Sequence, residues 1–372
     1  MNRYKITIVV GARPNFVKVA PIIHEIQRLQ FKSIPIDFRL VHTGQHYDKN
    51  MSSCFFDQLQ IPDPDANLGC HTGTQIQQIA HIMIAFEKEL MANKAHLVLV
   101  VGDVTSSMAC AITAQRLHVK VAHIEAGLRS SDWSMPEEIN RLIIDSISNY
   151  LFTTSSGASQ NLINEKINEP KVFFVGNTMI DTLMERLPYF KKPDFYDSFK
   201  LKSGNYLVVT LHRPSNVDNR QNLNKLITEI INNTRNLLIV FPMHPRTAKV
   251  FNSLKIDCKR LHVVHPMSYL EFNYLIQHSK AVITDSGGIT EETSILNIPC
   301  LTLRNNTERP ITVDLGTNEL VGTDPNNIKV YLDRLFNGQW KTLKKIPLWD
   351  GKTSKRILKI LINEFDKLSN DA

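Results

Sequence analysis

Short runs of β-branched and apolar residues alternate with longer helical patterns along almost the whole chain. The runs cover residues 5–10, 36–42, 96–101, 119–124, 149–154 and 171–176, and then 206–211, 236–241, 261–264, 281–284 and 299–303. Because continuous apolar runs of this length are typical of strands buried on both faces, the alternation predicts parallel sheets covered by helices on both sides. The expected class is therefore α/β, with doubly wound, Rossmann-like domains.

The chain has 372 residues, which is long for one hydrophobic core and favours two domains. A polar, irregular stretch at 187–205 separates the two groups of runs. We expect an N-terminal Rossmann-like domain over 1–190, a second one over 191–353, and a helix over 354–372 that packs back on the first domain. One side of that helix is apolar, with Ile357, Leu358, Leu361, Ile362 and Phe365.

Charge and cysteine usage exclude several classes of protein. The net charge is only +7, and no run of five Lys or Arg residues occurs, which disfavours a nucleic-acid groove and remains compatible with an anionic small molecule. No segment approaches the ~20 apolar residues of a membrane span. The five cysteines are scattered, as expected for free thiols in a reducing compartment, and the apolar run at the N-terminus is too short for a signal peptide. We expect a cytoplasmic protein with neither a nucleic-acid nor a membrane partner.

The segments that directly follow the predicted strands are rich in charge, His and Gly. Since ligands of open α/β sheets bind beyond the carboxyl ends of the strands, these segments predict a site between the two domains. Their sequences are GARPNFVK, TGQHYD, GDVTSS, HIEAGLR, LHRPSN, MHPRT and DSGGITEE.

Three acidic residues stand out as candidates for proton transfer. Asp103 follows a strand, where it either caps the next helix or serves chemistry. Glu125 ends a strand, and Glu137 follows Pro136 at a helix start, where a carboxylate also complements the helix dipole. Glu137 and Arg141 are four apart, so a solvated ion pair is the alternative. The opposite arc of that helix is apolar, with Ile139, Leu142, Ile143 and Ile147.

DSGGITEE, residues 285–292, follows a strand and opens a helix, so its glycines and helix N-terminus fit an anion such as phosphate, and a plain glycine turn is the equal alternative. Arg13, Lys18 and Arg309 also follow strands and could hold a diphosphate, the alternative being solvated surface. His212 and His244 could add acid, base or phosphate contacts. The chain has no G-x-G-x-x-G after a strand, no P-loop and no H-E-x-x-H, so we expect neither NAD nor a metal ion.

Seven short motifs follow one another along the chain: GARPNFVK, GDVTSSMA, HIEAGLR with MPEEINR, GNTMID, TLHRPSN, DSGGITEE and NTERP. In this order they closely resemble the non-hydrolysing UDP-N-acetylglucosamine 2-epimerases, from about residue 5 to the last helix. The resemblance implies a glycosyltransferase-B arrangement with an interdomain active-site cleft and no cofactor. It implies catalytic roles for Asp103, Glu125, Glu137 and His212. It places the UDP-sugar at Arg13, Lys18, Arg141, Phe272, Ser286, Gly287, Gly288, Glu292 and Arg309.

The activity that the resemblance implies is reversible epimerisation at C2 of UDP-N-acetylglucosamine to UDP-N-acetylmannosamine, by anti elimination of UDP and re-addition to 2-acetamidoglucal. Alternatives are a hydrolysing 2-epimerase, a 2-epimerase of a UDP-2,3-diacetamido sugar, a glycosyltransferase of the same fold, and a UDP-sugar binding module without catalysis.

The resemblance also implies a homodimer, a role in polysaccharide biosynthesis and a second UDP-N-acetylglucosamine as activator at Gln45 and His46, with His244 as a further contact. The chain departs from the family at Asn15, where many members have Glu, and in LHRPSN. Both departures bear on the exact substrate.

Overall fold

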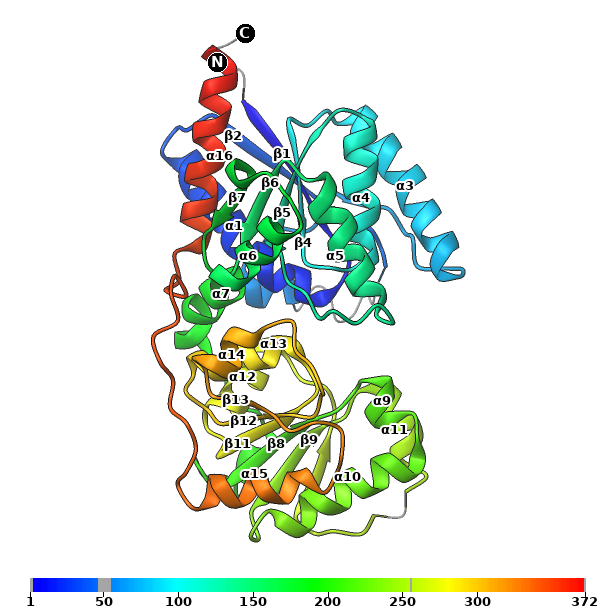
Figure 1. The fold of residues 1–372 in the computed structure, drawn as a ribbon, viewed down its shortest axis with the longest axis vertical. Helices are drawn as coiled ribbons and strands as arrows, with labels where there is room; N and C mark the ends of the chain where they lie inside the picture. The colour runs from blue at the N-terminus through cyan, green and yellow to red at the C-terminus, as the bar shows by residue number, and fades with distance from the viewer. Residues whose placement is uncertain (1–2, 46–54, 255, 371–372) are drawn as a thin grey trace. The chain divides into compact units, whose positions relative to one another are not determined.

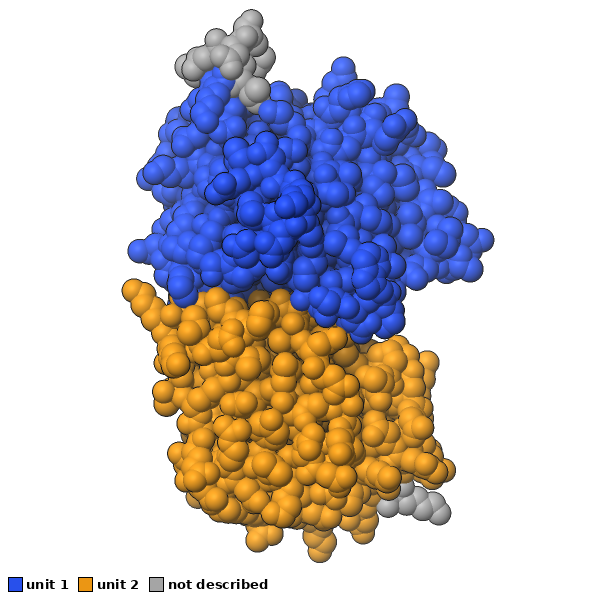
Figure 2. All heavy atoms as spheres, in the orientation of Figure 1, with its two compact units in different colours: residues 1–185, 347–372 blue, residues 186–346 orange. Residues whose placement is uncertain are grey.

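The structure is a computed structural model that describes residues 3–45, 55–254 and 256–370. Its contacts divide the chain into two compact units, coloured separately in Figure 2. The first comprises Met1–Glu185 with Pro347–Ala372, and the second comprises Arg186–Ile346. Each unit holds its own parallel sheet, so the predicted doubly wound α/β class is confirmed.

In the described residues of the first unit, seven parallel strands pair in the order β3-β2-β1-β4-β5-β6-β7. The order reverses direction between β1 and β4. Because parallel crossovers are right-handed, the helices of the two halves cover opposite faces, and the loops after β1 and β4 diverge to leave a crevice. The strands are β1 (Tyr4–Val10), β2 (Ile36–His42), β3 (Ala66–Asn67), β4 (Leu97–Val101), β5 (Lys120–Ala126), β6 (Tyr150–Thr153) and β7 (Val172–Phe174).

The helices of the first unit bury the sheet from both sides (Figure 1). Against one face, α3, α4 and α5 pack an apolar cluster that includes Phe86, Val100 and Ile144. On the other side α1 packs against the sheet and α16 packs on α1. The helices are α1 (Arg13–Phe31), α3 (Gln75–Ala92), α4 (Thr105–Arg116), α5 (Pro136–Ile147), α6 (Ser156–Asn164), α7 (Thr178–Arg186) and α16 (Thr353–Asn370).

The second unit repeats this plan over its described residues, with six parallel strands in the order β10-β9-β8-β11-β12-β13. Its reversal lies between β8 and β11. The strands are β8 (Tyr206–Thr210), β9 (Leu238–Pro242), β10 (Leu261–Val264), β11 (Ala281–Thr284), β12 (Cys300–Thr302) and β13 (Asn318–Leu320). The helices are α8 (Phe195–Ser198), α9 (Pro214–Val217), α10 (Arg220–Asn233), α11 (Pro245–Phe251), α12 (Tyr269–Gln277), α13 (Gly287–Ile295), α14 (Pro310–Asp314) and α15 (Asn327–Phe336).

All eleven predicted strands form, while the two- and three-residue edge strands β3 and β13 were not predicted. The last helix buries Ile357, Leu358 and Leu361, as its apolar stripe indicates. Its Phe365 stacks on Tyr4, with ring centroids 4.4 Å apart. Across the described part of the chain, no helix is both long and apolar enough to cross a membrane.

Candidate active site

The crevice of the first unit begins at the turn between β1 and α1. The Oδ1 of Asn15 accepts the backbone N–H of Gly11 and of Ala12, at 3.0 and 2.9 Å. Its Nδ2 donates to the carbonyl of Val101 at the end of β4, at 3.3 Å. An amide can accept on one side and donate on the other, which an ionised Glu cannot do. The departure at Asn15 therefore ties together the two loops that border the crevice.

Lys18 and Glu125 form a buried ion pair in this crevice, with side chains 9% and 5% exposed. Lys18 lies one turn into α1, and Arg13 lies at the exposed start of the same helix. The diphosphate role expected of these two side chains stays a prediction, and the Lys18 side chain is paired with Glu125. The pair lies over Gly102, where an added Cβ would meet the Glu125 Oε2 at 3.1 Å and the Lys18 Nζ at 3.3 Å.

Glu125 is the extra residue of a β-bulge. Ile124 pairs with Phe152 and Ala126 with the next residue of β6, so the register of the two strands shifts at Glu125. Its φ is 73°, in the left-handed region that residues with a side chain rarely adopt. Bulges occur next to active sites because they re-aim a side chain, and left-handed backbone at a non-glycine residue costs about 1–2 kcal/mol.

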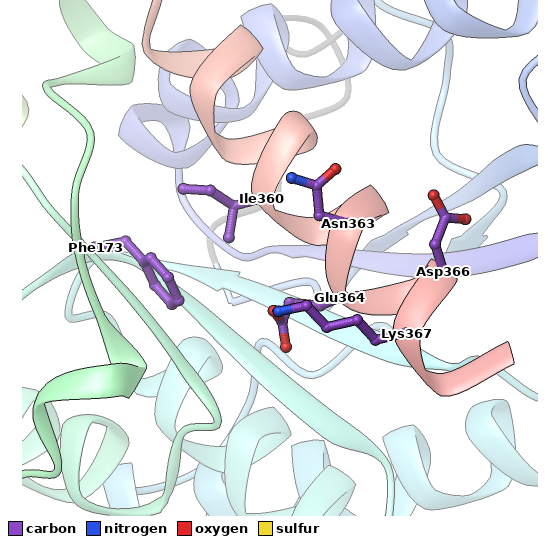
Figure 3. Close-up of a pocket in the computed structure, with 6 residues that line it drawn as sticks. All are labelled: Phe173, Ile360, Asn363, Glu364, Asp366 and Lys367. Atoms are coloured by element: carbon purple, nitrogen blue, oxygen red, sulfur yellow. The ribbon is translucent and has the colours of Figure 1, made fainter. Parts of the chain in front are cut away.

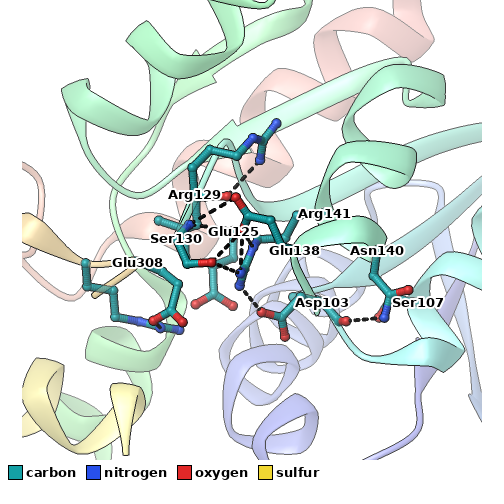
Figure 4. Close-up of polar contacts among 12 residues, drawn as sticks. Asp103, Ser107, Glu125, Arg129, Ser130, Glu138, Asn140, Arg141 and Glu308 are labelled. Atoms are coloured by element: carbon teal, nitrogen blue, oxygen red, sulfur yellow. Dashed lines mark hydrogen bonds and ion pairs between the residues drawn. The ribbon is translucent and has the colours of Figure 1, made fainter. Parts of the chain in front are cut away.

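Asp103 does not cap the helix that follows it. The N-cap of α4 is Val104, without a side-chain hydrogen bond, so the capping alternative is wrong. The Asp103 carboxylate instead accepts from Nη1 of Arg141 at 2.5 Å and is 28% exposed (Figure 4). The carboxylate is thus held by a buried guanidinium and is still accessible to a ligand.

The two adjacent acids at the start of α5 have opposite environments. Glu137 is exposed, whereas Glu138 is buried and accepts from Arg141 at 2.6 Å and from the backbone N–H of Ser131 at 2.9 Å (Figure 4). Burial opposes the charge of Glu138, but the Ser130, Arg141 and Ser131 donors hold its pKa below the ordinary range. The solvated pair between Glu137 and Arg141 is therefore wrong, because Arg141 is 2% exposed and pairs with Glu138 and Asp103.

The apolar arc predicted for α5 is also not its buried face. Ile139 is 42% exposed, and the buried positions are Glu138, Asn140, Arg141, Ile144 and Asp145. Polar side chains satisfied by ion pairs occupy the inward face, so hydrophobic periodicity points to the wrong side.

In the second unit, His212 lies directly after β8, and its Nδ1 is 2.8 Å from the Oδ1 of Asp285, which follows β11. Asp285 is fully buried and also accepts the backbone N–H of Arg213, at 2.9 Å, and the Nδ2 of Asn216, at 3.1 Å. Burial opposes its charge, but the bonds from His212, Arg213 and Asn216 hold its pKa below the usual value. Asp285 therefore connects the segments that follow β8 and β11, the two neighbouring strands at which the strand order of the second sheet reverses.

A cavity of about 200 Å³ opens beside His212. Its lining includes His244, Met267, Phe272, Ser286 and Ile289. Burial, followed by the nearby His212, lowers the pKa of His244, whose ring centroid lies 5.8 Å from that of His212. Apolar side chains with a few polar groups at the carboxyl end of a parallel sheet are typical of a small-molecule site.

The start of α13 forms the anion-type part of this site. Ser286 is the N-cap without a side-chain cap, and Gly287 begins the helix, so its first backbone N–H groups point outward. A Cβ on Gly287 would lie 2.7 Å from Nη1 of Arg309, so a larger residue would require the guanidinium to shift away from the helix start. Arg309 is held there by Glu291, at 2.9 Å. Gly288 follows in the first turn, as predicted.

Glu292, on the same helix, has a fully desolvated carboxyl. Burial raises its pKa to about 7, and the Nδ2 of Asn273 lies 3.5 Å from its Oε1. The group therefore changes charge near neutral pH, which is unusual for a glutamate.

Gln45 and His46 are the predicted contacts of a second nucleotide. Gln45 accepts the hydroxyl of Ser106 at 2.6 Å and its backbone N–H at 3.1 Å, at the start of α4. His46 lies outside the described residues. The structure thus groups Lys18, Asp103, Glu125 and Arg141 in the first unit, and His212, His244, Phe272, Ser286, Gly287 and Arg309 in the second.

Sequence reasoning missed the residues that support these groups. Asp285, Asn216, His123 and Asp145 are buried polar side chains whose partners are distant in sequence. The only available signal was their nearness to strand ends, since a buried ion pair leaves no periodic pattern.

A hollow of about 450 Å³ lies elsewhere in the first unit, beside α16 (Figure 3). It is lined by Phe173 of β7 and by Ile360, Asn363, Glu364, Asp366 and Lys367, and by none of the described candidate residues. The volume of a cavity is therefore not enough to identify the candidate active site in this chain.

The family profile of UDP-N-acetylglucosamine 2-epimerase matches residues 29–362. The chain belongs to this family. It is 39% identical to the UDP-N-acetylglucosamine 2-epimerase of Methanocaldococcus jannaschii, over 96% of this chain and 98% of that protein. It is also 39% identical to the UDP-2,3-diacetamido-2,3-dideoxy-D-glucuronate 2-epimerase of Pseudomonas aeruginosa, over 86% of this chain and 88% of that protein.

Solved structures of family members agree with the fold. The M. jannaschii enzyme, crystallised with UDP-GlcNAc and UDP, superposes on this chain with a TM-score of 0.87, covering 96% of this chain and 99% of that chain at 39% identity. The recognition made from the seven motifs is therefore confirmed.

Proposed function

We propose that the chain is a non-hydrolysing UDP-N-acetylglucosamine 2-epimerase, which interconverts UDP-N-acetylglucosamine and UDP-N-acetylmannosamine. The observation that carries the proposal is the set of carboxylates at the crevice of the first unit: Glu125 re-aimed by its bulge, Asp103 held by Arg141, and the exposed Glu137. Family membership and the full-length relatives supply the substrate class.

The chemistry explains why several acids are needed. The C2–H of an N-acetylhexosamine is not adjacent to a carbonyl, so direct deprotonation is too costly. Removal of that proton by a base, together with cleavage of the C1–O bond, forms the C1=C2 bond of 2-acetamidoglucal and releases UDP. A UDP oxygen then bonds to C1 while an acid delivers a proton to the opposite face of C2. Asp103, Glu125 and Glu137 are the proposed acid and base groups.

The departing diphosphate needs positive charge and N–H donors. The start of α13 and the guanidinium of Arg309 supply both, and Arg13 at the exposed start of α1 is a further candidate. Lys18 and Arg141 hold the carboxylates of Glu125 and Asp103. His212 serves as a proton-transfer or diphosphate contact with its ring fixed by Asp285, while Phe272, Ser286, Gly287, Gly288 and Glu292 form the UDP pocket.

A second candidate substrate is a UDP-2,3-diacetamido sugar, because the P. aeruginosa relative named for that activity has the same 39% identity as the M. jannaschii enzyme, over a shorter part of this chain. The buried, structural use of Asn15 removes one reason to favour this alternative, since the departure at that position is accounted for by the β1 and β4 loops.

We further propose a homodimer and activation by a second UDP-N-acetylglucosamine. Helix α3 supports the dimer, because Ile76, Ile84 and Met91 are 74%, 54% and 66% exposed. The relative crystallised with both UDP-GlcNAc and UDP supports a second nucleotide site. In this chain Gln45, His46 and His244 are its proposed contacts.

One experiment tests the reaction. The protein is incubated with UDP-N-acetylglucosamine in deuterated water, and the products are followed by NMR. The expected result is deuterium at C2 in an equilibrium mixture of the two UDP-sugars. Free N-acetylmannosamine with an equal amount of UDP would instead identify a hydrolysing enzyme. Exchange with a UDP-2,3-diacetamido sugar alone would identify the second substrate, and no exchange with either would overturn the proposal.

A further inference from the structure

One buried histidine connects the elements that carry the three proposed acids. His123 lies on β5, two residues before Glu125, and its side chain is fully buried. Its Nε2 is 3.0 Å from the carbonyl oxygen of Gly102, the residue before Asp103. Its Nδ1 is 2.6 Å from the Oδ1 of Asp145, on α5, the helix that starts with Glu137.

Both nitrogens of this ring face atoms that can only accept. The Gly102 carbonyl has no hydrogen to donate, so the Nε2 must carry one. The other oxygen of Asp145 pairs with the guanidinium of Arg129, which keeps the carboxylate ionised, so Asp145 also cannot donate. The Nδ1 must therefore carry a hydrogen as well, and the His123 side chain is an imidazolium.

The ring belongs to a network of alternating cations and carboxylates. The Oδ2 of Asp145 accepts Nη1 of Arg129 at 2.7 Å and the backbone N–H of Gly127 at 3.1 Å. Arg129 in turn pairs with Glu165 of α6 at 2.6 Å. Burial opposes the charge of Arg129, but Glu165 and Asp145 hold its pKa above the ordinary range. With a charged His123, the buried carboxylate of Asp145 lies between two cations, and Arg129 shares its charge with the exposed Glu165.

The other charges near the site are already paired among themselves. Glu125 pairs with Lys18, and Arg141 pairs with Asp103 and Glu138. The cluster of His123, Asp145, Arg129 and Glu165 is held together by its own ion pairs. It joins the loop after β4, the bulged end of β5 and helix α5, which are the carriers of Asp103, Glu125 and Glu137.

We propose that His123 is a positioning residue, a buried imidazolium whose bonds to Gly102 and Asp145 hold the three acid-bearing elements in register for proton transfer at C2. This inference rests on the proposed 2-epimerase function. Because proton transfer depends on placement within a fraction of an ångström, loosening this brace lowers the rate of chemistry and leaves nucleotide binding intact.

The direct test uses the wild-type protein labelled with ¹⁵N histidine. A long-range ¹H–¹⁵N spectrum at neutral pH, assigned with the His123→Gln variant, should show both ring nitrogens of His123 protonated. In Asp145→Asn, one of the two nitrogens should lose its proton, since the amide no longer balances the charge. An unprotonated ring nitrogen in the wild-type protein would overturn the proposal.

The kinetic test compares His123→Gln and Asp145→Asn with Ile144→Val. Ile144 is a buried α5 neighbour of Asp145, so its variant controls for lost stability. The expected result is a kcat for C2 exchange lowered roughly 10- to 100-fold in the first two, with the Kd for UDP unchanged and Ile144→Val near wild type. Wild-type kcat in Asp145→Asn, or equal losses in Ile144→Val, would contradict the positioning role. Absence of C2 exchange in the wild-type enzyme would instead contradict the proposed function and leave the spectrum to decide the protonation state.

Discussion

The Nδ1 of His212 lies 2.8 Å from the Oδ1 of the buried Asp285, so a carboxylate from the loop after β11 fixes the ring that follows β8. Because an ionised carboxylate accepts, the Nδ1 of His212 carries a hydrogen. The Nε2 is then the ring nitrogen that can gain or lose a proton. This arrangement joins the two loops at the reversal point of the second sheet, where ligands of α/β proteins bind.

Asp285→Asn should therefore impair chemistry more than binding. An amide that turns its NH₂ toward His212 forces the hydrogen onto the Nε2. The ring then presents an N–H donor to the substrate in place of an acceptor nitrogen. We expect kcat for C2 exchange to fall on the order of 100-fold, with a smaller change in KM. Asp218→Asn is the matched control, because Asp218 is a half-exposed carboxylate of the same unit, paired with Arg246. Equal kcat values for the two variants would contradict the role of Asp285.

Glu292 should make the stability of the second unit depend on pH near neutrality. Burial raises its pKa from 4.5 to about 7. A carboxyl with a raised pKa stabilises the folded state below its unfolded pKa, and that contribution is lost as the pH rises through 7. At about 1.4 kcal/mol for each pH unit between the two pKa values, the cost above pH 8 is at most about 3.5 kcal/mol.

The Glu292→Gln variant removes this cost. Its melting temperature should exceed that of the wild type by more at pH 8.5 than at pH 5, as measured by calorimetry. Glu229→Gln, which changes a partly exposed carboxyl on α10 of the same unit, should show no such difference. A gap between wild type and Glu292→Gln that is the same at both pH values would show that Glu292 does not titrate in this range.

The bulge at Glu125 predicts that glycine is more stable than alanine at this position, which is the opposite of the order expected at a regular strand position. Glu125→Ala and Glu125→Gly both remove the carboxylate that pairs with Lys18, so both should lose C2 exchange. They differ in backbone strain, because the φ of 73° is costly for alanine and free for glycine. We expect Glu125→Gly to be more stable than Glu125→Ala by about 1 kcal/mol in thermal or urea unfolding.

A regular position in the same strand provides the control. Ala122 is buried in β5 and pairs with Tyr150 of β6. There Ala122→Gly should lower the free energy of unfolding by about 1 kcal/mol, the opposite sign. If glycine were also the less stable choice at residue 125, the left-handed bulge would not be present in solution.

The fold was more predictable from the sequence than the site, for a physical reason. Buried parallel strands need continuous apolar runs, and all eleven predicted strands carry them, whereas the edge strands β3 and β13 do not. Helix α5 shows the limit. Its inward face holds Arg141 and Asp145, which can be buried only because distant residues pair with them. Such partners are chosen by the fold, so their positions cannot be read from local periodicity.

The adjacent residues Glu137 and Glu138 should respond oppositely to the same substitution. Glu137 is exposed at the start of α5, so Glu137→Gln should abolish C2 exchange while changing the free energy of unfolding by less than about 0.5 kcal/mol. Glu138 is buried against Arg141, and Glu138→Gln leaves that guanidinium without a charged partner in the helix. Breaking a buried ion pair from one side costs about 3 kcal/mol, so its melting temperature should fall by several degrees.

The pH dependence of the melting temperature distinguishes the loss of the Glu138 charge from the change in side-chain shape. Because the pKa of Glu138 is held below its ordinary value, its contribution to stability is present above about pH 4.5 and is lost as the pH falls through the folded pKa. The gap in melting temperature between wild type and Glu138→Gln should therefore narrow in acid, while that of Glu137→Gln stays near zero throughout. Retention of wild-type C2 exchange by Glu137→Gln would remove this residue from the proposed acids, leaving Asp103 and Glu125 to act on the two faces of C2.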